Sequence, residues 1–244
     1  MGLERFVGSG KGPEEVLREI DPAEFASAID HTMLKPAGDL KLLEKYADDC
    51  RRYGFRILIV PPSLVPYARE MGVRVGTVIG FPNGYAATRA KVAELEWAAE
   101  QGAEEADVVM NIALFKSGLH DAVLEDLKAV VSAARERGVK VVKVIIETGL
   151  LNDSEKAKAL ELVVASGADF VKTSTGFLGE GATIHDVSLL YGLARGRVQV
   201  KASGGIRHAM DALAMISAGA SRIGTSAGDK IFEELLALKG IRRG

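Results

Sequence analysis

The sequence predicts an α/β protein whose eight parallel strands close into a barrel. Three observations carry this prediction. Short runs rich in β-branched residues alternate with longer segments of helical periodicity along the 244 residues. A glycine precedes seven of the eight runs, as expected where a helix ends in a left-handed residue. The length suits one α/β barrel, which typically has about 250 residues.

The expected elements follow one another in a regular order. The expected strands are 27–34, 55–60, 73–80, 103–110, 139–146, 168–173, 197–202 and 220–226. The glycines before the second to the eighth strand are Gly54, Gly72, Gly102, Gly138, Gly167, Gly196 and Gly219. Helices are expected at 88–101, 123–137, 153–166 and 209–218, and at 229–238 after the last strand. Strands that alternate with helices of this length form βαβ units and a parallel sheet.

Two arrangements of such units compete. A doubly wound open sheet is expected to carry a GxGxxG turn after its first strand, and none follows residues 27–34. Eight units in one chain instead favour closure into a (β/α)8 barrel, the TIM-barrel fold. No stretch has the composition of a linker, so we expect residues 1–244 to form one domain. Residues 1–22 are expected to be a short N-terminal helical extension.

Composition and charge exclude several classes of function. A net charge of −2 argues against nonspecific binding to nucleic acid or to an anionic membrane. No apolar run approaches the roughly 20 residues of a membrane span, and the charged N-terminus lacks the apolar core of a signal peptide. The single cysteine and the dispersed histidines give no metal-ligand spacing. We therefore expect a cytoplasmic protein that acts on small molecules without a cofactor or metal.

Two lysines stand at the ends of apolar strands, in the stretches ADFVKTSTGF and VQVKASGG. Lys172 and Lys201 thus fall at the carboxyl ends of strands, where barrels of this kind place their active sites. Because side chains alternate along a strand, both can point into the barrel, as can Asp107 and Lys143 of the fourth and fifth strands. Purely structural ion pairs are the alternative. The strand-end position and the small, hydroxyl and glycine neighbours favour a functional site.

A pair of lysines is suited to forming a Schiff base with a carbonyl compound. The attacking amine must be neutral, and a free lysine with a pKa of about 10.4 is neutral in only about one molecule in 2,500 at pH 7. Desolvation and a second cation within about 4–6 Å both disfavour the ammonium form. A nearby carboxylate, that of Asp107, is placed to transfer protons through an ordered water.

Glycine-rich stretches after the seventh and eighth strands, SGGIR and IGTSAG, predict a phosphate site. In such barrels these two loops, together with a helix N-terminus, often bind phosphate. The residues expected to contribute are Gly176, Gly204, Gly205, Arg207, Gly224, Thr225 and Ser226. Either stretch alone would indicate only a turn. Asp30 and Thr32 share a face of the first strand, and lining the substrate site or making a structural hydrogen bond are equally open roles for them.

Seven ordered motifs make the chain resemble the 2-deoxyribose-5-phosphate aldolase family over nearly its full length. They are IDHTMLKP, VIGFPNG, GAEEADVVMNIALFKSG, KVIIETGLL, GADFVKTSTGF, VKASGGIR and RIGTSAG. The resemblance implies a metal-free class I aldolase on a (β/α)8 barrel. Such an enzyme reversibly cleaves 2-deoxy-D-ribose 5-phosphate to acetaldehyde and D-glyceraldehyde 3-phosphate in deoxyribonucleotide catabolism. We also expect a homodimer or homotetramer.

The resemblance assigns the roles within the lysine pair. It implies that Lys172 forms the Schiff base, that Lys201 lowers its pKa and that Asp107 transfers protons, with the phosphate on GGIR and GTS. The tail at 238–244 lacks the terminal tyrosine that some members carry. Two other hypotheses stay open. One is a different phosphate-binding barrel enzyme, such as another Schiff-base aldolase or a transaldolase, and the other is a catalytically silent barrel that binds phosphosugars.

Overall fold

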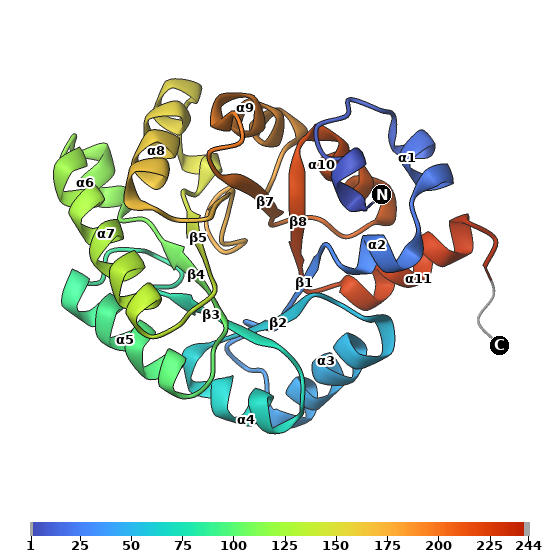
Figure 1. Ribbon diagram of the computed structural model, residues 1–244, viewed down its shortest axis with the longest axis horizontal. Coiled ribbons are helices and arrows are strands. Elements are labelled where there is room, and N and C mark those ends of the chain that lie inside the picture. The colour runs from blue at the N-terminus through green and yellow to red at the C-terminus, as the bar shows by residue number, and fades with distance from the viewer. Residues whose placement is uncertain (1, 242–244) are drawn as a thin grey trace.

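The strands close into a barrel in the order in which they occur in the sequence. In the computed structural model, which describes residues 2–241, neighbouring strands pair in parallel from β1 to β8, and β1 pairs with β8. The strands are β1 (Ile29–Thr32), β2 (Ile57–Val60), β3 (Val75–Ile79), β4 (Glu105–Val109), β5 (Val141–Ile145), β6 (Phe170–Lys172), β7 (Gln199–Ser203) and β8 (Ala220–Thr225). The predicted (β/α)8 barrel is thereby confirmed (Figure 1).

The helices form a ring around the outside of the barrel (Figure 1). Those expected from the sequence are α5 (Thr88–Glu100), α7 (His120–Glu136), α8 (Asp153–Ser166), α10 (Ala209–Ala218) and α11 (Gly228–Leu238). The ring also contains α3 (Leu40–Tyr53), α4 (Val65–Glu70), α6 (Ile112–Lys116) and α9 (Ile184–Ala194). Short 3-10 turns are η1 (Leu3–Arg5), η2 (Pro62–Leu64) and η3 (Thr148–Leu150). Helices α4 and α6 are too short to show a clear helical period in the sequence.

The helix ends lie where the glycines predict them. All seven of these glycines have positive φ, between 73° and 130°. Gly54 and Gly167 end α3 and α8 in the left-handed conformation that glycine adopts at little cost. The strands are shorter than expected: the predicted strand 27–34 is reduced to Ile29–Thr32, and 168–173 to Phe170–Lys172. Each loses two residues at its amino end, where the chain leaves the preceding helix, and the rest at its carboxyl end, where the next loop begins.

The N-terminal extension is helical, as predicted, and packs on the outside of the barrel. It contains α1 (Pro13–Glu19). Helix α2 (Pro22–Ala26) begins at the last residue of the predicted extension, so the helical segment before β1 reaches residue 26. Helix α1 lies against α10, and α2 lies against α11 (Figure 1). Asp21 and Glu24 form a capping box at the start of α2. Met1 and the tail residues 242–244, where the tyrosine is absent, lie outside the described residues.

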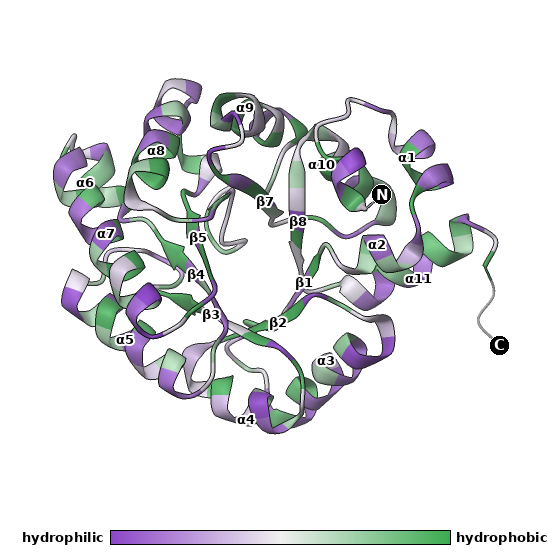
Figure 2. Ribbon diagram, in the orientation of Figure 1, coloured by the Kyte–Doolittle hydropathy of each residue, from purple (hydrophilic) through white to green (hydrophobic). Residues whose placement is uncertain are grey.

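The buried apolar side chains form two clusters of different size. Most buried apolar side chains lie in one large cluster, and a small second cluster contains Ile57, Ile59 and Val78 of β2 and β3. Figure 2 shows the strands mainly in hydrophobic colours and the outward positions of the ring mainly in hydrophilic ones. Within residues 2–241, no helix combines the length and the apolar character that crossing a membrane requires.

Candidate active site

Seven charged side chains meet at the centre of the barrel, each at most 6% exposed. They are Asp30, Glu105, Asp107, Lys143, Lys172, Lys201 and Arg222. Burying a charge is costly unless an opposite charge compensates it, and each of the seven has such a partner. There are four cations and three carboxylates. Within this set, a neutral amine on one lysine leaves three cations beside three carboxylates, and Arg74 pairs with Glu105 from outside the set at 3.5 Å.

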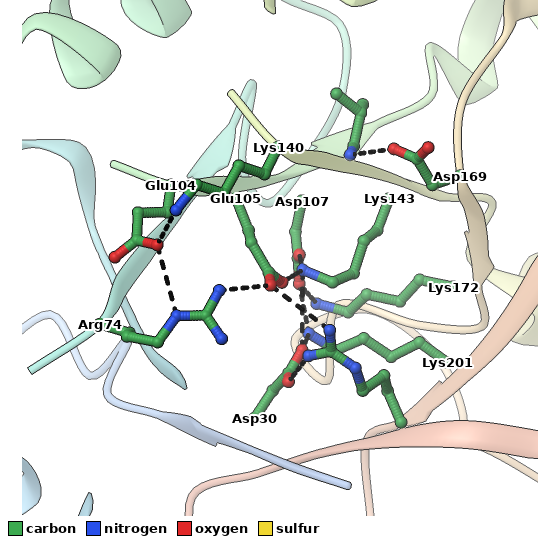
Figure 3. A network of polar contacts seen from close by, with 12 residues as sticks. Asp30, Arg74, Glu104, Glu105, Asp107, Lys140, Lys143, Asp169, Lys172 and Lys201 are labelled. Atoms are coloured by element: carbon green, nitrogen blue, oxygen red, sulfur yellow. Dashed lines mark hydrogen bonds and ion pairs between the residues drawn. The ribbon is translucent and has the colours of Figure 1, made fainter. Parts of the chain in front are cut away.

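Asp107 on β4 is the acceptor that connects the three lysines. Its Oδ1 lies 2.9 Å from Lys143 Nζ, and its Oδ2 lies 2.8 Å from Lys172 Nζ and 2.7 Å from Lys201 Nζ. Figure 3 shows the three lysine side chains converging on it. Burial alone would raise the pKa of the Asp107 carboxyl, but the three ammonium groups hold this pKa well below its usual value. Asp107 is therefore ionised.

The register of the barrel explains why these side chains meet. Asp107 pairs with Lys143 across β4 and β5, and Lys172 pairs with Lys201 across β6 and β7. Paired residues of neighbouring parallel strands point to the same side of a sheet, so each pair shares the barrel interior. The clustering of Lys143, Lys172, Lys201 and Asp107 that alternation along the strands predicts is therefore present in the structure.

Lys201 is held on its other side by the first strand. Its Nζ lies 2.6 Å from Asp30 Oδ2, and Arg222 of β8 donates to Asp30 Oδ1 at 2.6 Å. Burial would raise the pKa of Asp30, yet Lys201, Lys143 and Arg222 lower it. Gly224 leaves space for the lysine, because a Cβ at this position would lie 3.0 Å from Lys201 Cε. Asp30 is thus an ion-pair partner of Lys201 rather than a cavity-lining residue.

Lys172 differs from Lys143 and Lys201 because it alone of the three lines a cavity, of about 240 Å³. Burial lowers the pKa of Lys172 to about 8, helped by the charges of Lys201 and Lys143 and opposed by Asp107. The pKa of Lys143 is raised instead, because Asp107, Asp30 and Glu105 outweigh the effect of its burial. The structure therefore presents one amine of lowered pKa to the cavity, with fixed charges behind it.

The seven residues expected to bind phosphate line this same cavity, as does Thr32. Gly204 and Gly205 have φ values of 88° and 78°, in the region that favours glycine. The Thr225 hydroxyl is used within the protein: it donates to Ile206 O at 2.9 Å and accepts from Ala227 N at 3.0 Å. Thr225 therefore joins the loops after β7 and β8. Thr32 donates its hydroxyl to Asp30 O at 3.0 Å.

Comparison with known proteins identifies the family. The family model described as DeoC/LacD family aldolase matches residues 26–234. The chain belongs to the DeoC/LacD aldolase family. It is 47% identical, over 223 residues, to the deoxyribose-phosphate aldolase of Carboxydothermus hydrogenoformans, with 89% of this chain and 98% of that relative covered.

Two solved structures of related aldolases have the same fold. The aldolase QR15 is 43% identical with a TM-score of 0.85, and the match covers 90% of this chain and 99% of that one. The deoxyribose phosphate aldolase of Aeropyrum pernix, described as having a unique tetrameric structure, is 36% identical with a TM-score of 0.84. That match covers 91% of this chain and 95% of the other.

Sequence reasoning assigned no role to four residues around this family's barrel centre. Arg222 and Glu105 were not singled out as partners, because charged residues within strands do not reveal which charges they meet. Lys35 lines the cavity, and its side chain has no ion pair among the described residues. Glu147 is fully buried next to a cavity-lining loop. The paths of the loops bring Lys35 to the cavity and Glu147 against a loop that lines it.

One group with metal-ligand geometry lies outside the cavity of this DeoC/LacD family member. Ligand atoms of Asp153, His185 and Asp186 all lie within 4.8 Å of one another. The separation of 32 positions between Asp153 and His185 hides the group from any search for local ligand spacing. Lys156 forms ion pairs with Asp186 at 2.6 Å and Asp153 at 3.1 Å, so an ammonium group already contacts both carboxylates. None of the four lines the cavity.

Proposed function

We propose that the chain is a class I, Schiff-base aldolase that reversibly cleaves 2-deoxy-D-ribose 5-phosphate to acetaldehyde and D-glyceraldehyde 3-phosphate, in deoxyribonucleotide catabolism. One observation carries the proposal. A buried lysine with a pKa lowered to about 8 lines the same cavity as the glycine-rich loops and Arg207. An imine-forming amine and an anion-binding wall are the two features that a phosphorylated aldehyde substrate requires.

In the proposed reaction the neutral amine of Lys172 attacks C1 of the open-chain sugar, and loss of water gives a protonated imine. Removal of the proton from the C3 hydroxyl breaks the C2–C3 bond, and the electron pair passes into the imine to form an enamine. D-Glyceraldehyde 3-phosphate leaves first. Protonation of the enamine at C2 and hydrolysis then release acetaldehyde. Asp107, in contact with Lys172, is proposed to transfer protons through a water.

The charged cluster keeps the amine of Lys172 available. With a pKa of about 8, roughly one molecule in ten carries a neutral Lys172 at pH 7, against about one in 2,500 for an unperturbed lysine. Lys201 lies between Asp30 and Asp107 and supplies a fixed positive charge beside Lys172. We propose that this charge, together with burial, lowers the pKa of Lys172.

The phosphate group is proposed to bind between the glycine-rich loops and two cations. Arg207 and Lys35 both line the cavity, and neither side chain makes an ion pair within residues 2–241. Two unpaired cations beside backbone N–H groups suit a phosphate dianion. Gly176, Gly204, Gly205, Gly224, Thr225 and Ser226 are proposed to form the rest of this site.

Arg207→Ala is expected to weaken the use of phosphorylated sugar far more than that of unphosphorylated deoxyribose. A charge-assisted contact is worth about 1.5–3 kcal/mol, so kcat/KM for the phosphorylated substrate should fall roughly 10- to 100-fold. Arg18→Ala on the exposed face of α1 is the matched control, because Arg18 does not line the cavity. Equal losses with both sugars would place Arg207 outside the phosphate site.

Activity is expected to persist in excess EDTA. The imine already supplies the electron sink that a metal would otherwise provide, and Lys156 already forms ion pairs with both carboxylates of the Asp153–His185–Asp186 group. Initial rates should be compared before and after dialysis against the chelator. Activity that is lost and then restored by a divalent ion would contradict the metal-free mechanism.

A panel of donor substrates tests the reaction against its alternatives. In the direction of synthesis, the enzyme should join acetaldehyde, but not dihydroxyacetone phosphate, to D-glyceraldehyde 3-phosphate. A preference for dihydroxyacetone phosphate would indicate a different Schiff-base aldolase, and transfer of a three-carbon unit between sugars would indicate a transaldolase. Binding of phosphosugars without turnover would indicate a silent barrel.

Assembly, domain organisation and location complete the proposal. We propose that residues 1–244 act as one domain, since pairing of β1 with β8 joins the first strand to the last.

A homodimer or homotetramer is proposed because the Aeropyrum pernix relative is described as tetrameric and because Tyr67 and Trp97 are 47% and 43% exposed here. Light scattering at several concentrations measures this. The free, buried Cys50 suits the reducing cytoplasm that we propose.

A further inference from the structure

A buried glutamate beside the cavity lies outside the charged cluster. Glu147 follows β5 and is 0% exposed, and no ion pair of its carboxylate is found in the described part of the chain. Its backbone is left-handed, with φ 53° and ψ 68°, a conformation that is rare for residues other than glycine. Burial of the carboxylate and an unfavourable backbone both cost free energy. Such a residue needs a compensating set of contacts.

Those contacts fix the loop that follows β6. Glu147 Oε2 accepts hydrogen bonds from Thr175 N at 3.1 Å and from Thr175 Oγ1 at 2.5 Å. Thr175 Oγ1 in turn accepts from Phe177 N at 3.1 Å. Because the hydroxyl hydrogen points to Glu147, the hydroxyl lone pair is free to accept from Phe177. One carboxylate oxygen thus orders residues 175–177, which form one wall of the substrate cavity.

The turn that follows Glu147 also packs closely against the same loop at a second point. Gly149 approaches Glu180 so closely that a Cβ at 149 would lie 2.8 Å from the Glu180 backbone N and O. On the far side of the loop, Ala182 N donates to Gly204 O at 3.0 Å. The loop therefore bridges the turn after β5 and the glycine-rich end of β7.

The ordered wall lies on the phosphate side of the cavity. A Cβ at Gly176 would lie 3.6 Å from Gly204 Cα, so the loop directly adjoins the glycine pair proposed to bind phosphate. The other carboxylate oxygen, Glu147 Oε1, has no hydrogen-bond partner among residues 2–241. Among the described residues, the hydrogen bonds of the Glu147 side chain are therefore directed at Thr175 alone.

We propose that Glu147 is a positioning residue that acts through Thr175 to hold residues 175–177 in place for the phosphorylated half of the substrate. The inference rests on the proposed function and adds a specificity-determining residue to it. Acetaldehyde lacks the phosphorylated half, so formation of its imine on Lys172 does not require this wall. Loss of Glu147 therefore separates binding of the sugar phosphate from chemistry at the lysine.

Two substitutions test the link from its two ends. Glu147→Ala removes the acceptor, and Thr175→Val removes the hydroxyl while keeping the side-chain volume. Each should raise KM for 2-deoxyribose 5-phosphate roughly 10-fold or more, the factor expected on loss of a charge-assisted hydrogen bond. Borohydride trapping of acetaldehyde on Lys172 should stay within about threefold of the unaltered rate. The double variant should be no worse than the poorer single one, because both act on one contact.

Two controls separate this role from a general effect on folding. Glu147→Gln keeps an acceptor oxygen and should hold KM within about threefold of the unaltered enzyme. Thr148→Val changes the next residue, which is 1% exposed and whose hydroxyl has no partner within residues 2–241, and should leave KM unchanged. If Glu147→Ala does not fold, Thr175→Val gives the decisive KM.

Three results would overturn the inference, and they are distinguishable. An unchanged KM in Glu147→Ala or Thr175→Val would show that the wall does not depend on this contact. Equal losses in acetaldehyde trapping and in kcat/KM for the sugar phosphate would show general damage to the site. Absence of an acetaldehyde adduct on Lys172 in the unaltered enzyme would overturn the proposed function and this inference with it.

Discussion

Lys172→Leu is expected to abolish aldolase activity at every pH while leaving the fold intact. No other lysine of the cluster can replace the amine, because Lys143 and Lys201 are fully buried behind the cavity and are held by carboxylates. The fold should tolerate the change, because Asp107, the ion-pair partner of Lys172, keeps Lys143 and Lys201. We expect kcat/KM below detection from about pH 6 to pH 10, with an unchanged circular dichroism spectrum.

Activity that returned at alkaline pH would contradict this expectation. It would mean that Lys201 or Lys143 can reach the carbonyl carbon once it loses its proton. Mass mapping of the trapped adduct in the Lys172→Leu variant would then identify the substitute amine. Retained folding matters to the interpretation, so thermal unfolding should be measured on the same preparation.

Lys201→Leu is expected to move the rising limb of the pH profile of kcat/KM to higher pH. Lys201 lowers the pKa of Lys172, whereas Asp107 raises it, so removing the cation leaves Asp107 less compensated. The Lys172 ammonium is then more stable, and its pKa rises from about 8 toward the free value. Full restoration to about 10.4 would reduce the neutral fraction at pH 7 about 250-fold.

Burial remains in the Lys201→Leu variant and is the largest cause of the lowered pKa of Lys172, so the shift should be partial. We expect a loss of roughly 10- to 100-fold in kcat/KM at pH 7 that diminishes as the pH rises. The variant should also be less stable, because Asp30 and Asp107 each lose a buried partner. A rising limb at the unaltered pH would show that Lys201 acts structurally or as a proton donor.

The fold and the core of the candidate site follow from signals that are local in the sequence. Glycines at helix ends and short β-branched runs mark the eight strands, and alternation along a strand places Lys172, Lys201 and Asp107 on interior faces. The phosphate loops are indicated by their position after the last two strands. These features are predictable because each depends on a few neighbouring residues and on a general property of barrels.

The remaining features depend on register and on the paths of loops. Arg222 reaches Asp30 across 192 residues, and Glu147 reaches Thr175 across 28, so neither contact has a local signature. The sequence also does not show whether burial or the second cation contributes more to the lowered pKa of Lys172. Sequence reasoning named desolvation and a second cation together, and the structure makes burial the larger of the two. Proton transfer by Asp107 through a water stays a prediction.

The central claim is that Lys172 forms the Schiff base, and reductive trapping tests it most directly. The enzyme is incubated with acetaldehyde and borohydride, digested, and mapped by peptide mass. We predict inactivation together with a two-carbon adduct on the peptide that contains Lys172, and no such adduct in Lys172→Leu. An adduct found only on Lys201 or Lys143, or inactivation without any lysine adduct, would contradict the account.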